Sequence, residues 1–271
     1  MHLLSAPTLV PLHPQLWLAS SLSAGDSRCV ASGFAALDAE LPGGGWPTRG
    51  LSEILSASPG LLEWRLLAPA LRGLLSGPVD AAPKRRAPPR RAAQRPLLLI
   101  NPPHTPHLPG LQACGLAAQQ LVWISAGTPQ QQLWATEQAI KSNAAAAVLA
   151  WLPQARPEQL RRLQSHAQAT DAPVFIFRPL SAAAQSSAAP LRVRASPGLD
   201  WGLDVQILKR RGPAHEQALH LPALPAELAQ VLSPRMLAAA FPPVPHRPHQ
   251  PIAVEPRHAL ARPVTAHAAH H

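Results

Sequence analysis

The sequence is short of cysteine and of long apolar runs, and it contains no tyrosine at all. Its two cysteines, Cys29 and Cys114, lie far apart in apolar surroundings, which predicts buried free thiols rather than a disulfide or a metal pair. No apolar run approaches the ~18 residues that a membrane span requires. The N-terminus has no basic region of the kind that begins a signal peptide. We therefore expect a cytoplasmic protein that contacts no membrane.

Acidic residues are also scarce, with 14 Asp and Glu against 24 Lys and Arg and a net charge of +10. The carboxylates do not pair at spacings typical of general acid–base catalysis, so the sequence does not indicate that class of enzyme. The basic excess favours polyanions or acidic partner surfaces. An arginine- and alanine-rich proteome would give the same balance without any contact to nucleic acid, and the sequence leaves both explanations open.

Proline is abundant, with 34 residues against an average share of roughly 5%. Its distribution divides the chain into an N-terminal arm, a folded core, short C-terminal helices and a disordered Pro/His/Ala tail, at residues 1–28, 29–222, 223–240 and 241–271. Within the core, residues 78–96 combine proline with cations and are expected to form a disordered or extended insert. The tail histidines have no fixed geometry, so we assign no metal site to them.

The core alternates short apolar runs with amphipathic stretches, which is typical of an α/β fold with a mostly parallel sheet flanked by helices. The predicted strands are 51–55, 97–100, 121–125, 146–151 and 174–177, followed by late antiparallel edge strands at 191–195 and 203–210. The predicted helices are 33–41, 61–75, 130–143 and 157–170. Pro69 is expected to kink or interrupt the second helix.

Seven tryptophans are distributed along the chain. Five lie on or beside predicted elements and are expected in or near the core: Trp46, Trp64, Trp123, Trp134 and Trp151. Trp17 and Trp201 fall in irregular stretches, where a role in a protein interface is the better interpretation.

The loop at residues 56–63 lacks the phosphate-binding residues that the stretch before it leads one to expect. Residues 30–55 (VASGFAALDAELPGGGWPTRGLSEIL) resemble the stretch of RecA-type proteins that leads into a phosphate-binding loop. Such a loop needs backbone N–H groups, a lysine for the phosphate charge and a hydroxyl for magnesium. This chain instead has Ser56, Ala57, Ser58, Pro59 and Gly60, without a lysine. Glu63 then adds a carboxylate that would repel phosphates.

Two further positions lack the groups that phosphoryl transfer would use. The strand 97–100 runs into Asn101, which cannot act as a base on water. The strand 146–151 ends in Trp151 rather than in an acid that could hold magnesium. Since phosphoryl transfer depends on positioned charge and metal, we expect neither ATP hydrolysis nor a bound cofactor.

The combination of motifs is similar to the ImuA family, whose members are small RecA-like proteins related in annotation to SulA. The features that carry the resemblance are His13-Pro14-x-Leu16-Trp17, the Gly-rich segment 41–49, the degenerate loop and the Lys209–Pro213 ending. The resemblance implies an accessory protein of SOS-induced translesion DNA synthesis, in the DNA-damage response. The implied partners are an ImuB-type polymerase relative, an error-prone DNA polymerase III alpha-type subunit and, for some members, RecA.

Two basic clusters and one apolar pair are the candidate contact residues. The insert carries Lys84, Arg85, Arg86, Arg90, Arg91 and Arg95, and the end of the last predicted strand carries Lys209, Arg210 and Arg211. Such cations can release counterions from a phosphate backbone, but without interleaved aromatics they offer nonspecific DNA binding only. Leu16 and Trp17 in the arm either anchor the arm on the core or bind a partner.

The sequence leads to a binding protein rather than an enzyme, with one alternative from another class. The leading hypothesis is a noncatalytic RecA-like adaptor in a damage-tolerance polymerase complex. The alternative is a SulA-like cell-division inhibitor that binds FtsZ, although neither the basic insert nor the tail points specifically to that role.

Overall fold

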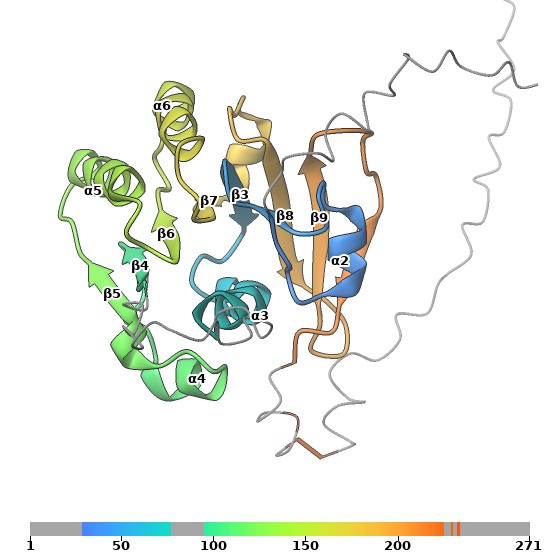
Figure 1. The fold of residues 1–271 in the computed structure, drawn as a ribbon. Helices are drawn as coiled ribbons and strands as arrows, with labels where there is room; N and C mark the ends of the chain where they lie inside the picture. The colour runs from blue at the N-terminus through green and yellow to red at the C-terminus, as the bar shows by residue number, and fades with distance from the viewer. Residues whose placement is uncertain (1–28, 77–94, 225–228, 230–231, 234–271) are drawn as a thin grey trace, which may run out of the picture.

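An eight-stranded, mostly parallel sheet forms the centre of the protein. The computed structural model describes residues 29–76, 95–224, 229, 232 and 233. The strand order is β10-β9-β8-β3-β7-β6-β4-β5, and the six strands from β8 to β5 are parallel to one another (Figure 1). These six are β3 (Leu51–Ser56), β4 (Leu97–Ile100), β5 (Leu121–Ile124), β6 (Ala147–Trp151), β7 (Val174–Pro179) and β8 (Leu191–Pro197). The predicted α/β class with a parallel sheet is confirmed.

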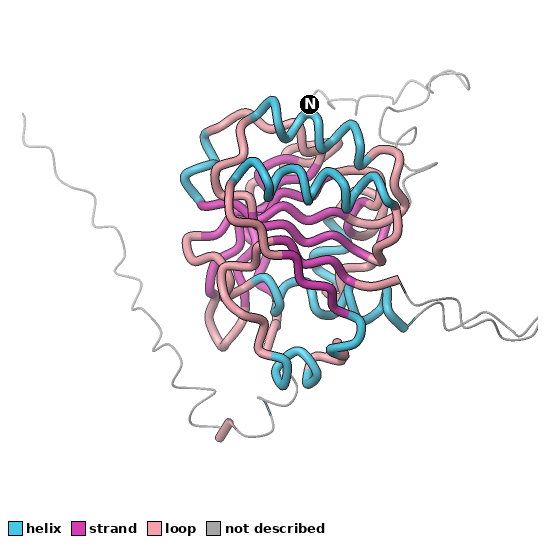
Figure 2. Tube along the Cα trace, turned by 90° about the vertical axis from the view of Figure 1, so that its left-hand side faces the viewer, coloured by secondary structure: helices cyan, strands magenta, loops and turns pink. Residues whose placement is uncertain are grey.

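Helices cover both faces of the sheet, as Figure 2 shows. On one face, α5 (Pro129–Ser142) and α6 (Pro157–Ala167) pack Leu133, Ile140, Leu160 and Leu163 against the strands. The other face is covered by α2 (Ala35–Glu40), α3 (Glu63–Ser76) and α4 (Leu108–Ala113). Because both faces are buried, the inner strands carry continuous apolar runs. This is why they could be recognised in the sequence.

The helix α3 runs through Pro69 without a break, so the predicted interruption is wrong. Pro69 lies in the second turn of the helix. Its ring also has a packing role, because a Cβ added to Gly33 would come within 2.4 Å of the Pro69 Cβ. Gly33 has a positive φ of 86° and can approach this closely only because it has no side chain.

Antiparallel strands close one edge of the sheet. The strand β9 (Leu203–Lys209) is antiparallel to β8, and β10 (Ala218–Leu221) is antiparallel to β9. The predicted antiparallel edge is confirmed for β9, but the prediction is wrong for β8, which is parallel to β3 and lies inside the sheet. The sequence analysis missed β10, whose four residues alternate between exposed and partly buried positions before Leu221. A separate two-stranded ribbon is formed by β1 (Cys29–Val30) and β2 (Trp46–Pro47).

Short 3-10 helices occupy two connections. One, η1 (Ala118–Gln120), precedes β5, and the other, η2 (Leu180–Ala184), follows β7. The two cysteines are free, as predicted, but each is only half-buried. Among the described helices none has the length and apolar character that crossing a membrane would require.

Several predictions lie outside the described residues. They are the arm with Leu16 and Trp17, the insert residues Lys84, Arg85, Arg86, Arg90 and Arg91, the 241–271 tail and most of the 223–240 segment. Arg95, at the end of the insert, is described.

Candidate functional site: a loop that holds its own carboxylate

The degenerate loop connects the buried strand β3 to the first turn of α3, at the carboxyl edge of the parallel sheet. Ser56 Oγ accepts a hydrogen bond from the Ser58 N–H at 3.2 Å, which makes a tight turn at the strand end. Gly60 follows with a positive φ of 89° and lies against the 103–104 turn, since an added Cβ would come within 2.6 Å of the His104 ring. The loop is therefore fixed on one side by β3 and on the other by this neighbouring turn.

The Glu63 side chain folds back into this loop. One carboxylate oxygen accepts the Gly60 N–H at 2.6 Å, and the other accepts the Leu62 N–H at 3.0 Å. The residue is 2% exposed. Loop N–H groups ahead of a helix form an anion-binding arrangement that phosphates commonly occupy. Here the carboxylate of Glu63 itself occupies this arrangement. The sequence predicted only that Glu63 would repel phosphates, whereas the structure shows that it takes their place.

Trp151, at the end of β6, supplies a third donor to the same carboxylate. Its indole N–H donates to Glu63 Oε1 at 3.2 Å. The Trp151 ring stacks on Phe177 with centroids 4.5 Å apart, and the Trp64 ring lies tilted to it with centroids 6.4 Å apart. The loop and the end of β6 therefore form one arrangement. Trp151, which stands where an acid was expected, donates to Glu63, the carboxylate that fills the loop.

Asn101 also has a structural partner. Its amide nitrogen donates to the Ala126 carbonyl at 2.8 Å, and its amide oxygen accepts the Ala126 N–H at 2.6 Å. Asn101 adopts a left-handed backbone with φ of 51°, a conformation that asparagine tolerates better than most residues. The side chain therefore ties the end of β4 to the segment after β5.

A buried charge cluster beneath the loop was missed by the sequence analysis. Glu53, in the middle of β3, pairs with Arg178 of β7 and Arg192 of β8, both at 2.8 Å. The two guanidinium groups also donate to the carbonyls of Ala155 and Ala182 and to the Gln185 side chain. The cluster fixes η2 and the segment after it over the sheet. Glu53 lies more than 120 residues from either arginine in sequence, so no local pattern could reveal the cluster.

A pocket of about 260 Å³ opens beside the loop. Its walls include Leu61, Leu62, Leu180 and Pro197, with Arg194 as the cation among its lining residues. Arg65, the cation nearest to Glu63 in sequence, points elsewhere and donates to the carbonyls of Trp201, Gly202 and Ala223. Burial lowers the pKa of this guanidinium below its ordinary value. A mostly apolar pocket of this kind is better suited to a side chain than to a polyphosphate.

Of the four predicted basic contact residues that the structure describes, three make hydrogen bonds or ion pairs within the protein. Arg210 pairs with Glu40 at 2.8 Å and Lys209 donates to the Ser187 carbonyl at 2.8 Å. Arg95 donates to the Asn143 backbone and side chain. Arg211 is exposed and makes no ion pair with a described carboxylate. In the 209–211 cluster, Arg210 is neutralised by Glu40, while Lys209 and Arg211 are exposed; DNA binding by this cluster stays a prediction.

Two tryptophans expected in the core lie on the surface. Trp123 on β5 is 47% exposed and Trp134 on α5 is 63% exposed, whereas Trp46 and Trp151 are buried as predicted. The strand β5 is the outer strand of the sheet, and Val122 beside Trp123 is exposed as well. Edge strands with exposed apolar side chains are uncommon on proteins that act alone. This exposed edge was hidden from the sequence because the β5 pattern alone does not say on which side the sheet ends.

No group of three or more His, Cys, Asp or Glu within the described part of the chain could hold a metal ion. No protein-family model matches this chain, and no curated protein matches it. The site therefore has to be interpreted from its own geometry.

Proposed function

We propose that this protein is a noncatalytic RecA-like accessory factor of SOS-induced translesion DNA synthesis. In this proposal it bridges an ImuB-type polymerase relative and an error-prone DNA polymerase III alpha-type subunit. RecA and nonspecific DNA are further partners that the same role allows. The proposal joins the sequence resemblance to an α/β core with a mostly parallel sheet.

The observation that carries the proposal is the Glu63 carboxylate inside its own loop. An ATPase keeps this position open for the phosphates of its substrate and places a lysine beside it. Here three N–H donors are already used by an attached carboxylate. A nucleotide phosphate would have to displace this anion from a buried position, so the arrangement favours a scaffold over an enzyme.

The exposed edge of β5 supports the binding half of the proposal. Tryptophan is enriched among the residues that dominate protein interfaces. Trp123 and Val122 lie on a strand whose outer side pairs with no other strand of the described sheet. Such an edge can accept a partner through both backbone and side chains.

The proposal is tested by mixing the purified full-length protein with an ImuB-type partner and the polymerase subunit. We expect co-elution on size exclusion, and we expect Trp123→Asp to weaken it at least tenfold. Leu199→Asp, a change at another exposed apolar side chain away from β5, is the matched control.

Calorimetry with Mg-ATP should detect no binding. Absence of co-elution, or ATP turnover by the wild-type protein, would contradict the proposal, and depolymerisation of FtsZ would support the SulA-like alternative.

A further inference from the structure

A polar hollow lies between α5 and α6, away from the Glu63 loop. It has a volume of about 420 Å³ and is lined by residues from the first turns of both helices and from the segment after β6. Its polar lining consists of four glutamines and two arginines, namely Gln130, Gln132, Gln154, Gln159, Arg156 and Arg162. Glutamine amides and guanidinium groups both donate hydrogen bonds to carboxylates or phosphates. The lining therefore favours an anionic ligand.

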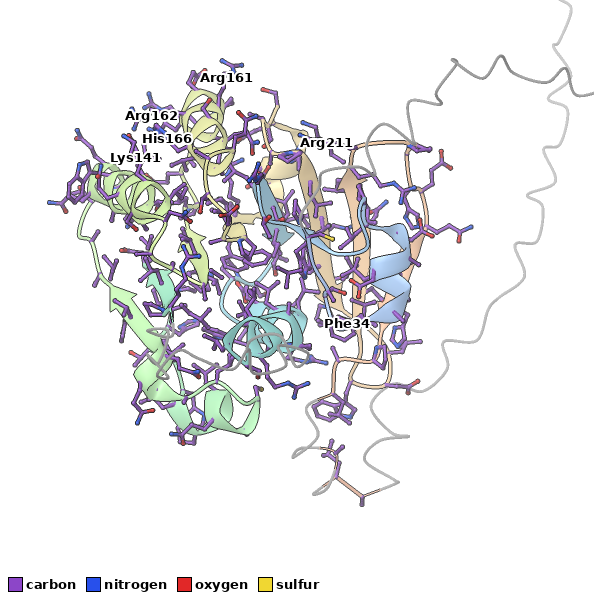
Figure 3. All side chains as sticks on the ribbon, in the orientation of Figure 1. Phe34, Lys141, Arg161, Arg162, His166 and Arg211 are labelled. Atoms are coloured by element: carbon purple, nitrogen blue, oxygen red, sulfur yellow. The ribbon has the colours of Figure 1, made fainter. Side chains whose placement is uncertain are left out.

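Beside the hollow, α5 and α6 lie against each other. On α5, Trp134, Glu137 and Lys141 follow one another at spacings of three and four residues, which places them on one face of the helix. Glu137 on this face contacts Arg162 and His166 of α6 at 3.0 and 3.3 Å, so the face looks toward α6. We call the hollow and this face of α5 together the α5–α6 groove. Figure 3 shows Lys141, Arg161, Arg162 and His166 gathered along these two helices.

The groove carries an excess of positive charge. The cations on it are Lys141 of α5 and the two arginines that line the hollow, Arg156 and Arg162, and its carboxylate is Glu137, which leaves two positive charges when His166 is not counted. Glu137 is 13% exposed and lies within 3.3 Å of Lys141, Arg162 and His166, so it is largely withdrawn from a ligand. Arg156 is exposed and forms no ion pair with any described carboxylate. Arg156 and Arg162 therefore present their guanidinium groups to the hollow.

We propose that the α5–α6 groove binds an acidic segment of a partner protein. The proposal deepens the accessory function proposed above and rests on it, because it names the chemistry of the partner segment. Arg156 and Arg162 would hold carboxylates through paired N–H donors. Trp134, 63% exposed, would pack against an apolar residue of the segment, as tryptophan and arginine together are typical of the strongest interface contacts.

The dimensions and the mixed charge favour a peptide over nucleic acid. The 11 residues of α6 span about 16 Å at 1.5 Å per residue, which is the length of about five extended peptide residues. A single nucleic-acid strand would place one phosphate about every 3.4 Å along the same path. Such a uniform row of charge has no matching row of cations here, because two of the groove's three cations, Lys141 and Arg162, already pair with Glu137. A peptide can place an apolar residue beside Glu137 and its acids elsewhere.

The test uses the full-length protein and a fluorescein-labelled peptide of about twelve residues that repeats Asp-Glu-Leu. Fluorescence anisotropy should show binding that weakens with salt, since the charges are exposed. The double change Arg156→Glu with Arg162→Glu should weaken binding at least tenfold. Trp134→Ala, an exposed position where folding is not at risk, should weaken it at least threefold. Arg211→Glu, which removes an exposed cation on another part of the molecule, should change it less than twofold.

Three results would overturn the proposal. The wild-type protein could fail to bind the peptide, or Arg211→Glu could weaken binding as much as the double change. A labelled oligothymidine of matching charge could also bind more tightly than the peptide and lose affinity in the same double variant. That last result would assign the groove to nucleic acid.

A parallel co-elution experiment separates this proposal from the accessory function. Loss of both the peptide and the ImuB-type partner in the double variant supports both proposals. Because the partner can also contact β5, the comparison is made with Trp123→Asp present: retention of the partner by the double variant in that background overturns the groove proposal and leaves the accessory function standing. Peptide binding through the groove without any co-elution of the wild-type protein contradicts the accessory function and supports the groove.

Discussion

Two buried carboxylates, ten residues apart, are stabilised in different ways. Glu53 lies within β3 and is paired with two guanidinium groups, each at 2.8 Å. Glu63 lies after the end of the same strand and is held by three N–H donors that carry no net charge. The first arrangement has more positive than negative charge, and the second leaves a buried negative charge surrounded by dipoles alone. The comparison shows that Glu53 fastens distant segments together, whereas Glu63 completes a local loop.

Removing Glu53 should have the largest effect. Glu53→Ala would leave Arg178 and Arg192 buried without their anion, and breaking a buried pair in this way costs about 3–5 kcal/mol. Urea unfolding followed by circular dichroism measures the change in the free energy of unfolding. The control is Glu158→Gln on the surface, which we expect to change stability by less than about 0.5 kcal/mol. Equal effects of the two changes would show that the cluster contributes nothing.

Removing Glu63 should have the next largest effect. Glu63→Ala would leave three donors without an acceptor and should lower the free energy of unfolding by about 3 kcal/mol. The vacated loop should then take up an inorganic anion. We expect 50 mM phosphate to raise the Tm of Glu63→Ala more than that of the wild-type protein. An equal shift in both proteins would contradict the interpretation that the carboxylate occupies an anion position.

Trp151→Phe isolates one donor of the three. The ring that stacks on Phe177 is largely retained, and the hydrogen bond to Glu63 is lost. A hydrogen bond to a charged group contributes about 1.5 kcal/mol or somewhat more. Trp64→Phe serves as the control because the Trp64 indole does not donate to Glu63. Similar losses in the two variants would mean that ring size, rather than the indole N–H, decides the outcome.

The surface carboxylate Glu137 should show the smallest effect, and it should depend on pH. The Lys141 hydrogen bond lowers the pKa of this carboxyl against the opposing effect of burial, and the charges of Arg162, Lys141 and His166 lower it further. Its contribution is therefore present above the unfolded pKa of about 4.3 and is lost as the pH falls through the lower folded value.

We expect Glu137→Gln to reduce stability at pH 7 by less than about 1 kcal/mol. The difference between this variant and the wild-type protein should shrink as the pH falls from about 5 to 3. Thermal unfolding at several pH values measures it. A difference that stays constant over this range would show that packing, and not ionisation, stabilises this position.

The central strands could be predicted from the sequence, since strands buried on both faces carry unbroken apolar runs such as Leu97–Ile100. The strand β10 could not, because a half-exposed edge strand of four residues has too weak a pattern. The location of Trp123 depends on which strand is outermost, and that is set by the order of strands in the sheet. Local sequence carries no information on this order.

In the candidate site, too, local features could be predicted from the sequence, whereas contacts between distant residues could not. The absence of a lysine in the loop is a local fact that the sequence shows directly. The contact between Trp151 and Glu63 joins residues 88 positions apart, and the Glu53 cluster joins residues up to 139 apart. The number of basic residues in the 209–211 cluster suggested a surface for polyanions. In the structure, Arg210 of this cluster is already paired with Glu40. Charge counts indicate available surface only after internal partners are known.

The order of strands also constrains how the chain is made. The strand β3 is complete at Ser56, yet its two neighbours in the sheet are β7 and β8, which begin at Val174 and Leu191. During synthesis more than a hundred residues emerge before β3 can pair, and pairings that distant in sequence form slowly. The apolar strands made early therefore stay exposed for seconds on the ribosome, at about 5–20 residues per second. The chain therefore depends on chaperones while it is being made, and truncations before residue 179 should yield insoluble chains.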